Sequence, residues 1–175
     1  YGRPVRGTVV GGRLAGFLSD HVGAKLRLVQ VDTPGAAVDV HPVTLISTAT
    51  LDHIRDGAGG PDDGWESRFR ILLELDGLPA FGEEAWESRT LAIGAAVVSV
   101  VGPVPRCVVT AQNPHTGVQD FDTLAALRRL RGAPGRTLST PTAHLPDGGR
   151  LMLGVYATVT TPGIVRCGDP VQVVE

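Results

Sequence analysis

The stretch LAIGAAVVSVV, residues 91–101, decides the fold class of this 175-residue chain. Its β-branched and small apolar residues predict a β-hairpin that turns at Gly94-Ala95. The apolar run continues to Val104 and has four interruptions, at Gly94, Ser99, Gly102 and Pro103. A run this short and this broken does not span a bilayer, so we expect a β-rich globular domain without membrane association.

Further short β-forming segments lie on both sides of this hairpin and predict additional strands. They are residues 1–10, 26–31, 42–46, 68–75, 106–111, 151–160 and 171–174. Apolar spacing predicts three helices: residues 13–22, residues 48–56 after an N-cap at Ser47, and a segment that carries Leu124, Leu127 and Leu130. Strands and helices do not alternate regularly, which disfavours a doubly wound sheet. We therefore expect a β-rich α+β fold, an antiparallel β-barrel with a few peripheral helices.

The composition argues against several classes of protein. A formal net charge of −2 argues against nucleic acid as the main partner. The chain opens with no charged-then-apolar signal sequence, and two cysteines, Cys107 and Cys167, are too few for a secreted disulfide scaffold. These features predict a cytoplasmic protein. Because the first residue is Tyr1 and the only methionine is Met152, we expect a fragment or a processed form of a longer chain.

Chemistry in this sequence has to rest on cysteine, histidine or arginine, because the common catalytic motifs are missing. We find no Walker A motif, no GxGxxG at a strand-to-helix junction, no HExxH and no GxSxG. Cys107 directly follows Arg106, and a neighbouring guanidinium favours the thiolate, which is a strong ligand for soft metals. The alternative is a buried structural cysteine in a Val-rich strand. For Cys167 we expect a packing role.

Asp39 and His41 form a second candidate pair. They lie two residues apart and would share one face of a strand. Such a pair could carry out acid–base chemistry or bind a polar ligand. A solvated strand end explains the same two residues equally well.

Several motifs resemble the signature of MOSC domains, which are named after the C-terminal part of molybdenum-cofactor sulfurases. Residues 106–110 (RCVVT), then 113–117 (NPHTG), then Asp122-Thr123-Leu124 carry the resemblance. Residues 68–70, 76–86, 91–94 and 154–171 also resemble conserved segments of the family. The similarity extends from about residue 14 to residue 174. Residues 1–10 resemble the tail of a smaller β domain that often precedes MOSC, so we assign residues 11–175 to a MOSC domain.

The resemblance implies a MOSC-type barrel and a molybdenum cofactor, molybdopterin. In the branch that reduces amidoximes, the cysteine matching Cys107 ligates molybdenum, and residues matching Arg70 and Asp39 lie at the cofactor. We expect further cofactor contacts from His41, Arg106, Thr110, Asn113 and Thr116. The implied enzyme is an oxidoreductase that reduces small N-hydroxylated or N-oxide substrates. Its electrons would come from a separate redox protein, because the chain has no flavin, haem or iron–sulfur motif.

One position departs from the family pattern, and two alternatives to the oxidoreductase stay open, of which the departure suggests the second. The family has Pro-Asn after the second arginine, and its asparagine contacts the cofactor, whereas this chain has Ile71-Leu72. The change removes a hydrogen-bond donor and an acceptor. The first alternative is a sulfur carrier that holds a persulfide on Cys107. The second is a non-catalytic binding module.

Overall fold

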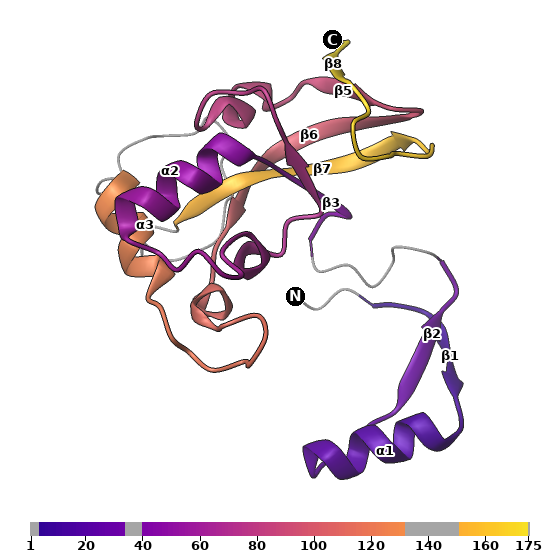
Figure 1. The fold of residues 1–175 in the computed structure, drawn as a ribbon. Coiled ribbons are helices and arrows are strands. Elements are labelled where there is room, and N and C mark those ends of the chain that lie inside the picture. The colour runs from indigo at the N-terminus through magenta and orange to yellow at the C-terminus, as the bar shows by residue number, and fades with distance from the viewer. Residues whose placement is uncertain (1–3, 34–39, 132–150, 175) are drawn as a thin grey trace. The chain divides into compact units, whose positions relative to one another are not determined.

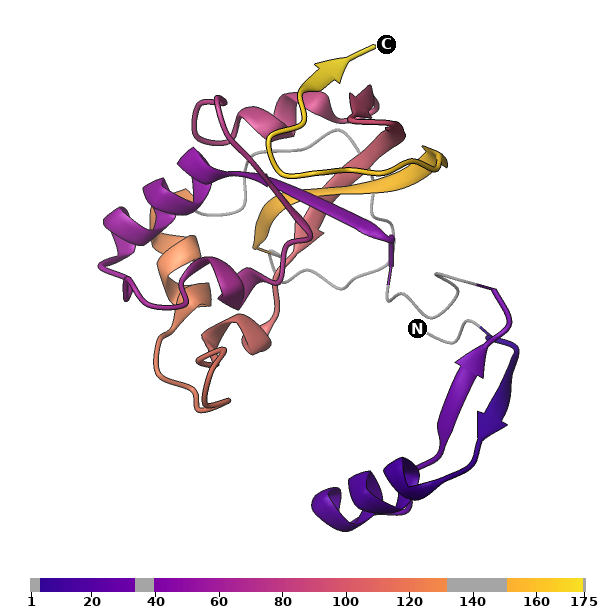
Figure 2. The same cartoon turned by 45° about the vertical axis from the view of Figure 1, so that its right-hand side comes forward.

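The structure is a computed structural model that describes residues 4–33, 40–131 and 151–174. The chain forms two compact units, Tyr1–Pro42 and Val43–Glu175. Figures 1 and 2 show them as ribbons in two views. Within the described ranges, no helix combines the length and the apolar character that crossing a membrane requires.

The first unit contains a two-stranded sheet and one helix. Strand β1 (Gly7–Val10) pairs antiparallel with β2 (Leu28–Val31), and helix α1 (Arg13–Val22) connects the two. The helix ends at Gly23, whose left-handed φ of 70° suits a residue without a side chain. The strands expected within residues 1–10 and 26–31 and the helix at residues 13–22 are confirmed. The domain boundary between residues 10 and 11 stays a prediction.

The second unit is built on a six-stranded sheet with the order β4-β3-β7-β6-β5-β8, and the sheet is curled (Figure 1). Its strands are β3 (Val43–Ser47), β4 (Leu73–Leu75), β5 (Thr90–Ile93), β6 (Ala96–Pro105), β7 (Met152–Thr161) and β8 (Val171–Val173). The β-rich α+β fold is thus confirmed. One pair corrects the expectation of an antiparallel sheet, because β3 and β4 run parallel. The chain between them includes helix α2 (Thr48–Ala58), which provides the long crossover that parallel strands need.

Two segments expected as strands are short 3₁₀ helices instead. Helix η1 (Glu66–Phe69) includes the first two residues of the segment 68–75. Only the last three residues of that segment form a strand, β4. Helix η3 (Val108–Ala111) replaces the strand expected at residues 106–111. The remaining helices are η2 (Gly82–Trp86) and α3 (Thr123–Arg131).

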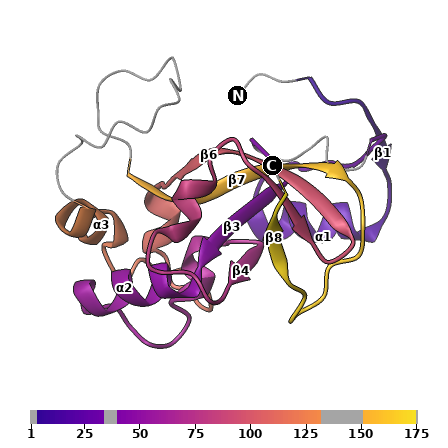
Figure 3. The same ribbon diagram turned by 90° about the horizontal axis from the view of Figure 1, so that it is seen from above.

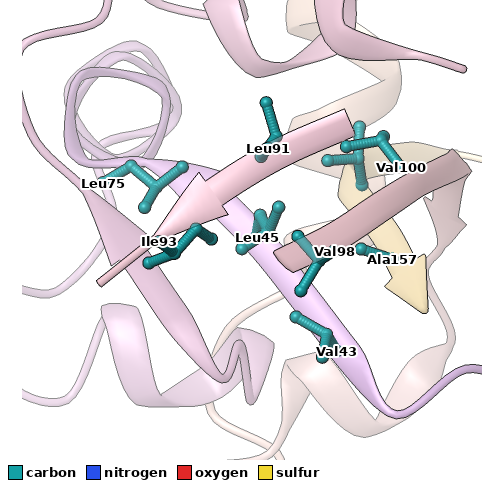
Figure 4. Packing of buried hydrophobic residues seen from close by; sticks show 9 residues of the cluster. Val43, Leu45, Leu75, Leu91, Ile93, Val98, Val100 and Ala157 are labelled. Carbon is teal, nitrogen blue, oxygen red and sulfur yellow. The ribbon is translucent and has the colours of Figure 1, made fainter. Parts of the chain in front are cut away.

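Two buried apolar clusters hold this unit together. The first lies on the inner face of the curled sheet and includes Leu45, Leu91, Val98 and Ala157 (Figure 4). The second joins the sheet to α2 and α3, which lie side by side (Figure 3). Its members are Ile46, Leu51, Ile54, Trp65, Phe69, Leu127 and Leu153. Phe69 and Leu153 matter for the site, because their carbonyl groups face the arginine that precedes Cys107.

Candidate functional site

Cys107 lies where strand β6 ends and helix η3 begins. It is the N-cap of η3, with extended backbone angles (φ −120°, ψ 174°), and its side chain is exposed. Its carbonyl oxygen accepts hydrogen bonds from the backbone N–H of Thr110 at 3.2 Å and from the Thr110 hydroxyl at 2.9 Å. The backbone of Cys107 is therefore fixed while its thiol stays accessible. The exposure of both cysteines also shows that burial is wrong for Cys107 and that a packing role is wrong for Cys167.

Two buried threonines support this turn. The Thr110 hydroxyl lies 2.5 Å from the hydroxyl of Thr123, at the start of α3. Because Thr110 donates its only hydroxyl proton to the Cys107 carbonyl, Thr123 must donate to Thr110. The predicted site residue Thr110 therefore acts inside the protein, as a link between Cys107 and α3. The sequence reasoning used Thr123 as part of the family motif but predicted no role for it beside Cys107.

Arg106 points into the protein. Its Nη1 donates to the carbonyl of Phe69 at 2.7 Å, and its Nε and Nη2 both donate to the carbonyl of Leu153. Burial lowers the pKa of Arg106 to about 10, although the nearby charges of Tyr156 and Cys107 act in the opposite direction. The residue therefore stays charged at neutral pH and fastens the end of β6 to β7 and η1. Its expected contact with cofactor charge stays a prediction.

A glycine in strand β7, Gly154, leaves space for the Arg106 guanidinium. Gly154 has a left-handed φ of 73°, and a Cβ at this position would lie 2.7 Å from the Leu45 carbonyl oxygen and 3.4 Å from Nη2 of Arg106. A side chain at residue 154 would therefore collide with β3 and crowd the guanidinium.

Arg68 and Arg70, two residues apart, have opposite environments. Arg70 follows η1 with a left-handed φ of 51°, and its side chain is exposed. The side chain of Arg68 is fully buried, and its Nη1 lies 2.7 Å from Oδ1 of Asp120. Of the two, Arg70 has the exposure that contact with a bound anion requires. The Arg68–Asp120 pair was missed by the sequence reasoning, because no local motif links residues so far apart in the chain.

Asn113 and Thr116 use their polar atoms to order the turn after η3. Asn113 donates from Nδ2 to Asp120 at 2.8 Å, and its Oδ1 accepts from the backbone N–H groups of His115 and Thr116. The Thr116 hydroxyl accepts from the N–H of Val118. Hydrogen bonds from Arg68 and then Asn113 lower the pKa of Asp120 to about 2. Cofactor contacts by Asn113 and Thr116 stay predictions, and the structure shows them shaping the loop.

The remaining predicted positions are less informative. Asp39 lies outside the described residues. His41 is half-buried, belongs to the first unit and precedes β3, so its expected pairing with Asp39 on one face stays a prediction. Leu72, at the family's asparagine position, is 61% exposed, and its backbone N–H donates to Thr44 at 2.8 Å. Among the described residues, no three His, Cys, Asp or Glu side chains converge to hold a metal ion.

Comparisons with known proteins agree on one family. A family model for the MOSC domain matches residues 32–172. The mitochondrial amidoxime-reducing component 1 of Xenopus laevis is 28% identical over 76% of this chain and 36% of its own length. The mitochondrial amidoxime reducing component 2 of Homo sapiens is 34% identical over 59% of this chain and 29% of its own length. The Rattus norvegicus component 2 is 28% identical over 98% of this chain and 54% of its own length. The chain thus spans about a third to a half of these relatives.

Proposed function

Because the chain belongs to the MOSC domain family, we propose that it binds a molybdenum cofactor through the Cys107 thiolate and serves in the reduction of N-hydroxylated or N-oxide substrates. One observation carries the proposal: the cysteine of the family motif has an accessible thiol on a fixed backbone. A buried cysteine could not have reached a ligand of this size.

The chemistry of the available groups fits such a cofactor. A cysteine thiolate is a soft ligand and suits molybdenum, and an exposed guanidinium suits a phosphate group. Cys107 and Arg70 provide these two groups on the surface of the second unit. When bound, the cofactor would supply the two-electron chemistry that reduction of an N–O bond requires.

The other residues of the site prepare Cys107 for this role. Arg106 fixes the chain directly before it, and Thr110 holds its carbonyl group. Arg70 would offset phosphate charge, and the cofactor contacts expected of Asp39 and His41 stay predictions. The full reaction takes two electrons and two protons and releases water from the N-hydroxyl group. A separate redox protein would deliver the electrons.

The test uses the two cysteines as matched variants. The longer protein that contains this chain is purified without oxygen, and molybdenum and pterin are quantified per chain. We expect Cys107→Ser to lose most of the molybdenum and Cys167→Ser to keep it. Full molybdenum occupancy in Cys107→Ser would refute the ligand assignment.

The accessible thiol also suits the sulfur-carrier alternative. That function predicts a mass increase of one sulfur on Cys107 and no bound pterin. Mass spectrometry of the same preparations distinguishes the two proposals, because the persulfide disappears on reduction with a thiol reagent and a cofactor does not.

A further inference from the structure

Helix η3, which carries Cys107 at its start, is a single turn of four residues. A single 3₁₀ turn is not stable in isolation, because too few backbone hydrogen bonds offset the entropy lost in ordering it. Its position must therefore be set by side chains that contact its two ends. At the N-terminal end, Thr110, supported by Thr123, bonds the carbonyl of Cys107. At the C-terminal end, Arg68 bonds the carbonyl of Ala111.

Arg68 joins both arms of the loop that follows η3. Its Nη1 pairs with Oδ1 of Asp120 at 2.7 Å and donates to the carbonyl of Ala111, the last residue of η3, at 3.4 Å. The backbone N–H of Asp120 donates to the same Ala111 carbonyl at 3.2 Å. Arg68 thus fixes the loop where it leaves η3 and where it returns.

Stability alone explains this arginine poorly. Its Nε and Nη2 are buried and have no hydrogen-bond partner among the described residues. Buried N–H groups without partners cost free energy, and so does the desolvation of a guanidinium whose carboxylate partner is partly exposed. The best attested benefit of such a pair is that it specifies one arrangement of the chain.

We propose that Arg68 is a positioning residue which, paired with Asp120, sets the orientation of the Cys107 thiol through η3. The two arginines of the segment 68–70 then have separate tasks, since Arg68 orders the loop from inside while Arg70 faces solvent. This inference rests on the proposed function in one respect, namely that Cys107 is the functional thiol. Its test needs no cofactor, so the two proposals can fail separately.

The experiment measures how accessible the Cys107 thiol is in the full chain carrying Cys167→Ser. Alkylation rates are measured with a small reagent, iodoacetamide, and a bulky one, N-phenylmaleimide. The ratio of the two rates reports steric access, because both reagents attack the thiolate and its population cancels. We expect Arg68→Met and Asp120→Asn each to change this ratio by about threefold or more. The double variant should change the rate ratio no more than either single variant does, because the two residues act as a pair. Arg68→Lys keeps a positive charge, and its ratio should lie closer to the parent value than that of Arg68→Met.

Two controls separate positioning from general loosening of the fold. Arg89→Met removes an exposed guanidinium and should leave the ratio unchanged. In a Cys107→Ser background, Arg68→Met should leave the alkylation of Cys167 unchanged. If Arg68→Met does not fold, Asp120→Asn carries the test, because the carboxylate is partly exposed and asparagine has its shape. The proposal is overturned if the variants fold and keep the parent ratio of alkylation rates. It is also overturned if the changes in this ratio caused by Arg68→Met and Asp120→Asn add in the double variant.

Discussion

The chain contains the dipeptide Arg-Cys twice, at residues 106–107 and at residues 166–167. Both thiols are exposed, yet the arginines differ. Arg106 is half-buried and bonds two backbone carbonyls, whereas Arg166 is exposed. Around Cys167, the backbone N–H of Arg166 donates to Asp169 in a surface turn. The comparison teaches that exposure alone does not define a site: what distinguishes Cys107 is an accessible thiol on a chain held from within.

The largest expected effect comes from removing Arg106, the half-buried arginine of the first dipeptide. Arg106→Ala leaves the carbonyls of Phe69 and Leu153 without their donors and empties a buried volume. We expect it to lower the free energy of unfolding by about 3 kcal/mol, and Arg166→Ala by about 0.5 kcal/mol or less. Urea denaturation of the two variants measures both values. Equal losses would mean that the two arginines contribute alike and that the comparison fails.

A smaller effect is expected from the hydroxyl that holds Cys107. Thr110→Val keeps the shape of the side chain but removes its bonds to the Cys107 carbonyl and to Thr123. We expect a loss of about 1–2 kcal/mol in the free energy of unfolding. Thr160→Val is the matched control, because its hydroxyl bonds the Val97 carbonyl at an exposed position where water can replace it. A Thr110→Val variant as stable as the control would show that the link to α3 is unimportant.

Asp120, in the loop that follows η3, should also affect how the stability of the protein falls in acid. The folded-state pKa of Asp120 is about 2, below its ordinary value of 3.8. Its contribution to stability is therefore complete above pH 3.8 and is lost as the pH falls toward 2. Asp120→Asn should reduce stability at neutral pH and flatten the further loss in this acid range. Denaturation curves between pH 2 and 7 test it; an acid slope identical to the parent's contradicts the assignment.

The smallest effect on stability is expected at the position where the sequence departs from its family. Leu72 is 61% exposed, so Leu72→Asn should change the free energy of unfolding by no more than about 0.5 kcal/mol. The variant restores a donor and an acceptor beside Arg70, and we expect the molybdenum content per chain to rise. If the content stays the same while the fold is intact, residue 72 does not limit binding of the cofactor.

Sequence reasoning succeeded where local pattern and final environment agree. The hairpin expected in residues 91–101 forms from β5 and β6, and Gly94 adopts the positive φ of 55° that its turn requires. It failed at residues 106–111, where the Val-Val-Thr run favours a strand. There the Thr110 side chain and N–H both bond back to Cys107, which closes a turn instead.

The motif around Cys107 predicted the candidate site, but the residues that support the Cys107 backbone could not be read from spacing. Asn113, Thr110 and Thr116 were expected to face a cofactor, and the structure uses their polar atoms within the loop. The pair of Arg68 with Asp120 is a tertiary contact between segments that carry no shared pattern. A fully buried arginine is recognisable from sequence only when its partner is already known.

The long-range hydrogen bonds of Arg106 have a consequence for when the support of Cys107 can form during synthesis and folding. Its guanidinium bonds carbonyls 37 and 47 positions away in the chain, the second of them in β7. Contacts between such distant segments form late in folding, after the intervening loops have closed. While the ribosome is still synthesising the residues before β7, Arg106 therefore lacks its bonds to the Leu153 carbonyl, and the support of Cys107 is incomplete. If Cys107 holds a cofactor as proposed, we expect stable loading only after β7 has been made and has docked against Arg106.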